Sequence, residues 1–349
     1  MSGPVTSRSV LVTGGAGYVG AHTCKALAKA GYNPVVYDNL STGHEDFVRW
    51  GPLIKADIRD HETLREVMSS HDISAVLHFA ACAYVGESVI NPQKYYDNNV
   101  TGTLSLLRAM LDTDISTIVF SSSCAIYGEP DRVPITEAAP KQPVNTYGAS
   151  KLIIERVLSD YTRAYGIRSI ALRYFNAAGA DPDGEVGELR DPETHLIPRA
   201  MMAIQGYLTD FAVFGCNYPT PDGTAIRDYI HVVDLAEAHL AALRRLQDGK
   251  PGGAYNLGTG QGYSVKQVLK AITNDTGKEL RTPMGLRREG DPAELIADAS
   301  LGRRELGWSP HLSDLKTIVR TAWAWHRRAH PRRTTLPPAD QLSAAGRTH

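Results

Sequence analysis

The stretch SVLVTGGAGYVG, residues 9–20, decides the fold that the rest of the chain must adopt. Its apolar start, residues 9–12, is typical of a buried strand, and three regularly spaced glycines then break that strand into a turn. A helical pattern follows over residues 21–30 and stops at Gly31, a residue that suits the left-handed backbone of a helix end. The stretch therefore predicts a strand, a glycine turn and a helix in succession.

A second apolar run, residues 34–38, ends in a carboxylate, Asp38, about 20 residues after the glycine turn. Strand, turn, helix and a later acidic residue together are the context of a dinucleotide site. Gly14 and Gly17 let the backbone turn tightly beside a pyrophosphate, Gly20 lets helix and strand pack closely, and the free N–H groups of the helix start bind phosphate. Because a carboxylate at Asp38 accepts hydrogen bonds from ribose hydroxyls and repels a 2′-phosphate, NAD is predicted rather than NADP.

Strands alternate with helical segments as far as about residue 178, with further strands indicated at residues 75–79, 117–120 and 169–173. This alternation predicts an α/β fold with a doubly wound parallel sheet of the Rossmann type. After Gly179 the pattern changes to loops rich in Pro, Asp and Gly, followed by short helices and strands, which indicates a smaller α/β domain for substrate.

We therefore predict a dinucleotide-binding domain over residues 1–178 and a substrate-binding domain over residues 179–330. Residues 331–349 contain Pro337 and Pro338 and little apolar content, and we predict a mobile tail there.

Tyr147 and Lys151 lie one helical turn apart behind Asn145 and Thr146, which are suited to cap a helix, so the two side chains can share one face. A phenol beside an ammonium group loses its proton more easily than a phenol in water, which makes Tyr147 a candidate general base. The spacing alone is also typical of an ordinary amphipathic helix start. The dinucleotide pattern earlier in the chain is what favours a catalytic pair.

The Gly-x-x-Gly-x-x-Gly turn and the Tyr-x-x-x-Lys pair together resemble the extended branch of the short-chain dehydrogenase/reductase superfamily. Within that branch, the chain resembles the UDP-glucose (UDP-galactose) 4-epimerase family over about residues 9–330. The segments that carry this resemblance are HFAA (78–81), VGES (85–88), YYDNN (95–99), SSS (121–123), RYFN (173–176), RDYIH (227–231) and REGD (288–291).

The resemblance implies reversible epimerisation at C4 of UDP-glucose and UDP-galactose through a 4-keto intermediate, with NAD holding the hydride temporarily. Tyr147 takes the proton of the sugar 4-hydroxyl, Ser123 bridges the 4-oxygen and the phenol, and Lys151 binds the nicotinamide ribose and lowers the pKa of the tyrosine. Without the resemblance, Ser123 in a run of serines would be an ordinary turn hydroxyl.

The resemblance also implies two sets of binding residues. Cofactor contacts are predicted for Gly14, Gly17, Tyr18, Val19, Gly20, Asp38, Asn39, Leu40, Ser41, Thr42, Gly43, Asp57, Ile58, Phe79, Ala80, Ala81, Cys82, Ala83, Asn98, Ser123, Tyr147, Lys151 and Phe175. Substrate contacts are predicted for Asn176, His195, Leu196, Ala212, Val213, Phe214, Arg227, Arg288, Asp291 and Leu295.

Within the substrate set, the two arginines suit the diphosphate, Asp291 the uridine ribose, and Phe214 with its two preceding neighbours the uracil. Leu295 stands near the sugar 2-position, where family members restricted to UDP-glucose and UDP-galactose often have Tyr. A smaller residue there predicts some activity on a UDP-N-acetylhexosamine.

Two positions depart from the family pattern. Ala83 stands where many members have Lys, so cofactor retention is predicted to be weaker. His195 stands where others have Asn, and a neutral imidazole still donates one hydrogen bond. His78 is predicted to be a satisfied histidine at a strand end rather than a catalyst.

Composition favours a small-molecule partner, because 37 Lys and Arg residues balance 38 Asp and Glu residues among 349, which leaves no basic field for nucleic acid. No apolar run is long enough for a membrane span and no signal peptide is evident, so we expect a cytoplasmic protein. The four cysteines are widely separated, which indicates neither a metal site nor disulfides, and we expect all four to be buried small hydrophobes.

A homodimer is also expected, since family members pair two helices, here residues 92–110 and 147–164, across a four-helix interface. Ile153, Val157 and Tyr161 are candidates for apolar stripes on it, although such stripes could equally pack on the sheet.

Rival functions differ at identifiable residues. A nucleotide-sugar 4,6-dehydratase carries Asp-Glu directly after the position of Ser123, where this chain has Cys124 and Ala125, so elimination is disfavoured. A non-catalytic NAD-binding regulator could dispense with Tyr147 and Lys151, which are both present. Epimerases of UDP-xylose and UDP-arabinose use the same groups, and the sequence leaves that alternative open.

Overall fold

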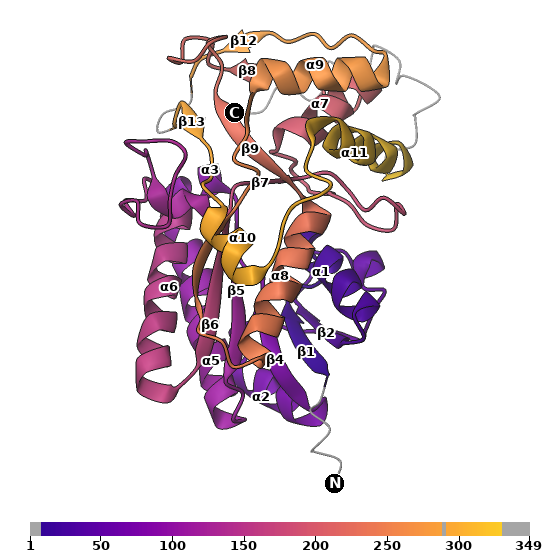
Figure 1. Cartoon of the computed structure of the whole chain (residues 1–349). Helices are drawn as coiled ribbons and strands as arrows, with labels where there is room; N and C mark the ends of the chain where they lie inside the picture. The colour runs from indigo at the N-terminus through magenta and orange to yellow at the C-terminus, as the bar shows by residue number, and fades with distance from the viewer. Residues whose placement is uncertain (1–7, 288–290, 330–349) are drawn as a thin grey trace.

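Seven parallel strands form the larger sheet of this structure, a computed structural model that describes residues 8–287 and 291–329 (Figure 1). In order across the sheet they are β10 (Gly253–Leu257), β6 (Arg168–Tyr174), β5 (Thr117–Ser123), β4 (Ile73–His78), β1 (Ser9–Thr13), β2 (Asn33–Asp38) and β3 (Leu53–Lys55). The chain runs from β1 to β3 at one edge and then crosses back to β4, so the order reverses between β1 and β4. Ligands bind at the carboxyl ends of strands at such a switch point. The predicted doubly wound parallel sheet is confirmed.

Helices cover both faces of this sheet. One face carries α1 (Tyr18–Lys29) and α8 (Val232–Gln247), and the other carries α2 (His61–Ser70), α5 (Gly102–Asp112) and α6 (Thr146–Tyr165). Because the strands are buried on both sides, their sequences are nearly continuous apolar runs. Helix α1 begins at Tyr18, earlier than the pattern over residues 21–30 indicated, because the extended residue Gly17 already caps it.

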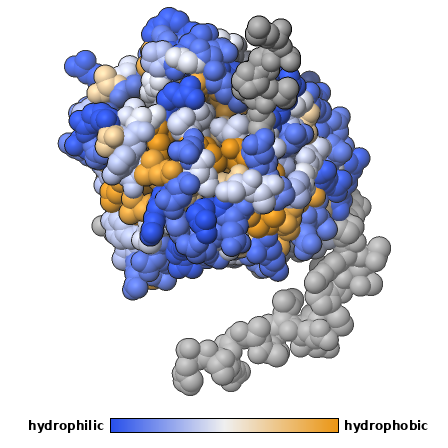
Figure 2. All heavy atoms as spheres, turned by 90° about the horizontal axis from the view of Figure 1, so that it is seen from below, coloured by the Kyte–Doolittle hydropathy of each residue, from blue (hydrophilic) through white to orange (hydrophobic). Residues whose placement is uncertain are grey.

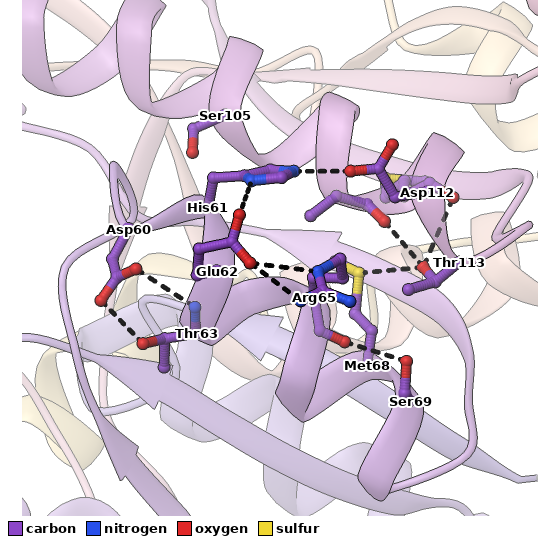
Figure 3. A network of polar contacts seen from close by, with 12 residues as sticks. Asp60, His61, Glu62, Thr63, Arg65, Met68, Ser69, Ser105, Asp112 and Thr113 are labelled. Atoms are coloured by element: carbon purple, nitrogen blue, oxygen red, sulfur yellow. Dashed lines mark hydrogen bonds and ion pairs between the residues drawn. The ribbon is translucent and has the colours of Figure 1, made fainter.

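A polar network holds α2 against α5 on the second face (Figure 3). Asp60 caps α2 by accepting a hydrogen bond from the Thr63 backbone N–H at 3.1 Å. From the next position, the His61 ring reaches the Asp112 carboxylate at the end of α5 over 2.7 Å. These contacts fix two helices that cover the strands leading to the switch point.

A smaller part lies above the carboxyl ends of the large sheet in Figure 1. Its strands are β7 (Asn176–Ala178), β9 (Ile226–His231), β11 (Gly262–Ser264) and β13 (Glu294–Leu295), which pair around β9, and β8 (Val213–Phe214), which pairs with β12 (Met284–Gly285). Three helices, α7 (Leu196–Gln205), α9 (Val265–Thr276) and α11 (Leu315–Ala329), share an apolar core with β9. The short helices α3 (Val85–Ile90), α4 (Pro92–Tyr95) and α10 (Ser300–Leu306) complete the set of α-helices among the described residues.

The chain passes more than once between the two parts. Beyond residue 178 the chain returns to the large sheet and supplies α8 and β10. The large sheet and its helices are therefore built from residues on both sides of position 178. Lys25 on α1 ties the parts together by binding the carboxylates of Asp181 and Asp183, each at 2.7 Å, and that of Glu185.

The surface and the cysteines qualify the expectations from composition. Seen from below, the molecule is mostly hydrophilic with separate hydrophobic patches (Figure 2), and within the described residues no helix has both the length and the apolar character to cross a bilayer.

All four cysteines are free thiols. Cys24 and Cys124 are buried as predicted, but the prediction is wrong for Cys216, which is exposed on a loop, and for the half-buried Cys82. The predicted tail, residues 331–349, lies outside the described residues.

Candidate active site

The glycine turn between β1 and α1 has the shape that a dinucleotide requires. Gly14 has φ +72°, and a Cβ on it would stand 2.6 Å from the backbone nitrogen of Ala80. A Cβ on Gly20 would stand 2.2 Å from the carbonyl oxygen of Gly14. Helix α1 has neither an acidic residue in its first turn nor a side-chain cap, so its N–H groups suit a phosphate. The predicted residues fit NAD on these observations.

Asp38 at the end of β2 organises the neighbouring loop. Its carboxylate accepts hydrogen bonds from the backbone N–H groups of Ala16 at 3.0 Å and Leu40 at 2.8 Å. Since each carboxylate oxygen has two lone pairs, Asp38 retains capacity for the predicted ribose contact. Asp57 after β3 is held by Arg59, which lowers the pKa of that carboxyl to about 2.

Asn99 is a buried residue of this site that the sequence analysis missed, having selected its neighbour Asn98. Its side chain accepts a hydrogen bond from the Cys82 N–H at 2.8 Å and donates to the Cys82 carbonyl at 3.0 Å and to Ser150 at 3.1 Å. It lies in a π-helical turn, Tyr96–Thr101, and such turns often mark functional sites. Asn99 therefore fixes the strand-end segment of predicted cofactor contacts, residues 79–83, against α6.

The three predicted catalytic residues converge at the carboxyl end of β5. Ser123 ends the strand, and Tyr147 and Lys151 lie on the first two turns of α6, which Asn145 caps by accepting from the Gly148 N–H at 2.8 Å. The Ser123 hydroxyl lies close enough to the Tyr147 phenol to act on its pKa, and it accepts a hydrogen bond from the Ala125 N–H at 3.1 Å. The Lys151 ammonium lies 5.8 Å from the centre of the Tyr147 ring and donates to a carbonyl of β5 at 2.8 Å.

The predicted lowering of the tyrosine pKa by Lys151 is not what the structure shows. Burial raises the pKa of the Tyr147 phenol well above its usual range, and the groups that oppose burial are the Ser123 hydroxyl and the charge of Arg190. Burial also lowers the pKa of Lys151 to about 7, so this ammonium is only partly charged at neutral pH. In the isolated chain, desolvation outweighs the attraction that the spacing of the pair suggested.

His78 has the structural role that the sequence indicated. Its two ring nitrogens pair with Thr13 at 2.7 Å and with Thr103 at 2.8 Å, and burial lowers its pKa to about 3. A neutral histidine with both nitrogens engaged links β4 to β1 and α5.

On the substrate side, Arg227 in β9 forms an ion pair with Asp291, and Tyr218 donates to the same carboxylate at 3.3 Å. These two predicted ligands therefore lie together, and the Tyr218 ring packs against Gly215, the residue that directly follows Phe214 at the end of β8. The other predicted arginine, Arg288, lies outside the described residues.

Leu295 packs against the apolar cluster that includes Cys124, the residue directly after β5, and Phe175. Asn176 begins β7 directly after Phe175, and Leu196 begins α7. The structure thus brings these predicted residues to the junction between the two parts of the molecule.

His195 lies at the start of α7 and is paired with a carboxylate. Its Nδ1 contacts Glu188 at 2.6 Å, while its side chain is 44% exposed. Glu188 also accepts from Arg190, and burial together with the Glu188 charge raises the pKa of Glu193 to about 7. This acidic group, like Arg190, escaped the sequence analysis because it lies in a loop without a recognisable motif.

Comparison with known proteins shows the family to which this chain belongs. The model of the NAD dependent epimerase/dehydratase family matches residues 10–258. The chain belongs to this family. The predicted family resemblance and NAD as the family's cofactor are confirmed.

Relatives in this family are similar along nearly their whole length. The UDP-glucose 4-epimerase of Rhizobium meliloti (strain 1021) is 52% identical over 322 residues, which are 92% of this chain and 98% of that protein. The structure of UDP-glucose 4-epimerase from Brucella ovis in complex with NAD is 55% identical, covers 90% of this chain and 97% of that chain, and has a TM-score of 0.88. The Stenotrophomonas maltophila UDP-glucose-4-epimerase, solved with NAD and formylated UDP-arabinopyranose, is 41% identical with a TM-score of 0.88, covering 92% of this chain and 98% of that chain.

The shifted pKa of Lys151 predicts a pH dependence of stability. Between about pH 7 and 8.5 the folded chain releases the Lys151 proton while an unfolded lysine keeps its own, so the unfolded state binds more protons and stability rises with pH. Relative to Lys151→Met, the unfolding free energy of the wild type should rise by about 1–2 kcal/mol across this window. Urea unfolding without added nucleotide measures it.

Lys266 provides the matched control, because it also donates to a backbone carbonyl, at 2.8 Å, but from an exposed position. The Lys266→Met curve should run parallel to the wild type. A Lys151→Met curve that also runs parallel would contradict the assignment.

Proposed function

We propose that this chain is a UDP-hexose 4-epimerase that interconverts UDP-glucose and UDP-galactose with bound NAD. The observation that carries the proposal is the meeting of Ser123, Tyr147 and Lys151 at the switch-point end of the sheet, beside a glycine turn shaped for a dinucleotide. The names of the relatives agree with this activity.

The two parts of the chain divide the binding. Residues around the large sheet hold NAD through the α1 N-terminus, the Asp38 loop and the segment of residues 79–83. The smaller part holds the UDP-sugar, with Arg227 and Asp291 toward the nucleotide and Leu295 toward the sugar.

When bound, NAD supplies a positively charged ring that accepts hydride from the sugar C4 and returns it to the opposite face. Tyr147 takes the proton of the 4-hydroxyl as C4 is oxidised and gives it back when C4 is reduced. Ser123, the last residue of β5, passes that proton for whichever epimer lies farther from Tyr147. Lys151 is anchored by a β5 carbonyl and would bind the nicotinamide ribose.

The assembly we propose is a homodimer through α3, α5 and α6. Exposed apolar side chains gather on these helices and the adjoining turn, including Val89 at 64%, Ile90 at 86%, Leu104 at 39% and Ile153 at 39% exposure. Val157 and Tyr161, by contrast, are partly buried against the core beneath the sheet. Light scattering at micromolar concentration should return the mass of two chains, and a monomer mass would assign these side chains to another role.

Tyr147→Phe tests the reaction. The variant should fold and bind NAD and UDP-galactose, yet lose about 10²-fold or more in kcat, because only the proton acceptor is removed. NMR of the sugar products from UDP-galactose, UDP-N-acetylgalactosamine and UDP-xylose measures turnover and ranks the substrates.

Tyr32→Phe is the matched control, since it removes a phenol that bonds Gln247 on the surface. It should retain the wild-type rate. A near-normal rate in Tyr147→Phe would overturn the assignment, and wild-type inactivity on all three sugars would overturn the proposed function.

Leu295→Tyr tests substrate breadth. The added ring would enlarge the side chain at the proposed sugar-facing position, so kcat/KM for UDP-N-acetylglucosamine should fall about tenfold or more while that for UDP-glucose changes little. Steady-state kinetics of both substrates in wild type and variant measure the ratio. An absence of N-acetyl activity in the wild type, or an equal loss on both sugars, would rule out a gate at this position.

A further inference from the structure

Arg190 is a cation enclosed by residues from both parts of the molecule. It lies in the segment between β7 and α7, and its Nε forms an ion pair with the buried Glu188 carboxylate at 3.0 Å. Its guanidinium carbon lies 5.7 Å from the centre of the Tyr84 ring, a cation–π contact. Tyr84 directly follows Ala83, whose methyl group offers no donor to a ligand.

The charge of Arg190 faces the reacting end of the site. Burial dominates the raised pKa values of Tyr18, Tyr147 and Tyr174, and in each case the positive charge of Arg190 acts in the opposite direction. Tyr18 is the first residue of α1, at the glycine turn, and Tyr147 is the proposed base. The segment that holds Arg190 also contacts the glycine-turn side of the site, because the carbonyl of Leu189 pairs with the His44 ring at 2.8 Å and the Leu189 side chain packs on the cluster that contains Ala21 of α1. Arg190, which directly follows Leu189, therefore lies near the first turn of α1.

The neighbouring carboxylates leave this cation with capacity for a ligand. Glu188 is shared, because the oxygen that accepts from Arg190 also contacts His195 at 2.6 Å. The other nearby carboxyl, Glu193, has its pKa raised to about 7 and is only partly charged at neutral pH. A guanidinium has five N–H donors, and the Arg190 side chain remains 20% exposed.

We propose that Arg190 binds a phosphate oxygen of a diphosphate that lies between the α1 N-terminus and Tyr147. This inference rests on the proposed function, in which two ligands carry a diphosphate, the dinucleotide and the UDP-sugar. A planar fork held on one side by Glu188 and Tyr84 presents its remaining N–H groups to an anion.

Calorimetric titration of the full chain with NAD, and of the NAD-loaded chain with UDP, tests the proposal. Arg190→Met should raise the dissociation constant of one nucleotide by about tenfold or more, because a charge-assisted hydrogen bond is lost. Arg190→Lys, which keeps the charge without the fork, should show a smaller increase. Arg65→Met is the control, since it removes a guanidinium from the surface pair with Glu62 shown in Figure 3.

A loss confined to NAD assigns Arg190 to the dinucleotide, and a loss confined to UDP assigns it to the nucleotide sugar. Unchanged dissociation constants for both nucleotides, whether or not the melting temperature falls, would overturn the proposal. If Arg190→Met does not fold, the Arg190→Lys titrations decide by the same criterion. Turnover of UDP-galactose by the wild type is read separately, so an inactive wild type would contradict the proposed function without altering the binding result.

Discussion

The close approach of backbone to backbone at the glycine turn is the constraint on which the rest of this structure depends. The carbonyl oxygen of Gly14 stands where a Cβ of Gly20 would be, and Gly14 in turn lies against the backbone of Ala80 beyond β4. This contact brings the start of α1 and the end of β4 together at the switch point of the sheet. An added methyl group at either glycine would push apart the groups that form the phosphate site.

Burial, more than pairwise charge, sets the electrostatic character of the site. Tyr147 and Lys151 lie on the first two turns of α6, and each neutral form is favoured because the charged form loses its hydration. Groups that oppose this effect come from different elements: Ser123 from β5, and Arg190 from the loop before α7. The pKa values of Tyr147 and Lys151 are therefore sensitive to any charge that binds beside them, because charges interact more strongly where little water is present.

The joint between the two parts is held by buried charge. Lys25 on α1 is surrounded by carboxylates of the segment after β7, while Glu188 farther along binds both Arg190 and His195. Removing the partner of a buried charge leaves that charge uncompensated, so the pair of Lys25 with the buried Asp181 fixes the relative position of the parts more strictly than surface pairs do. In the proposed function, that relative position sets the distance between a sugar bound by the smaller part and the proton-transfer groups Tyr147 and Ser123 at the end of the large sheet.

The sequence by itself determined the doubly wound sheet, the glycine turn, Asp38 and the Tyr147–Lys151 pair. All of these depend on local spacing: apolar runs bounded by glycine, and residues one helical turn apart. Only the tertiary structure decided the return of α8 and β10 to the sheet, the anchoring of Cys82 by Asn99, and the placing of Arg190. It also reversed the expected pKa shift of Tyr147. The physical reason is that desolvation and long-range contacts depend on which distant segments cover a residue, and no local pattern records that.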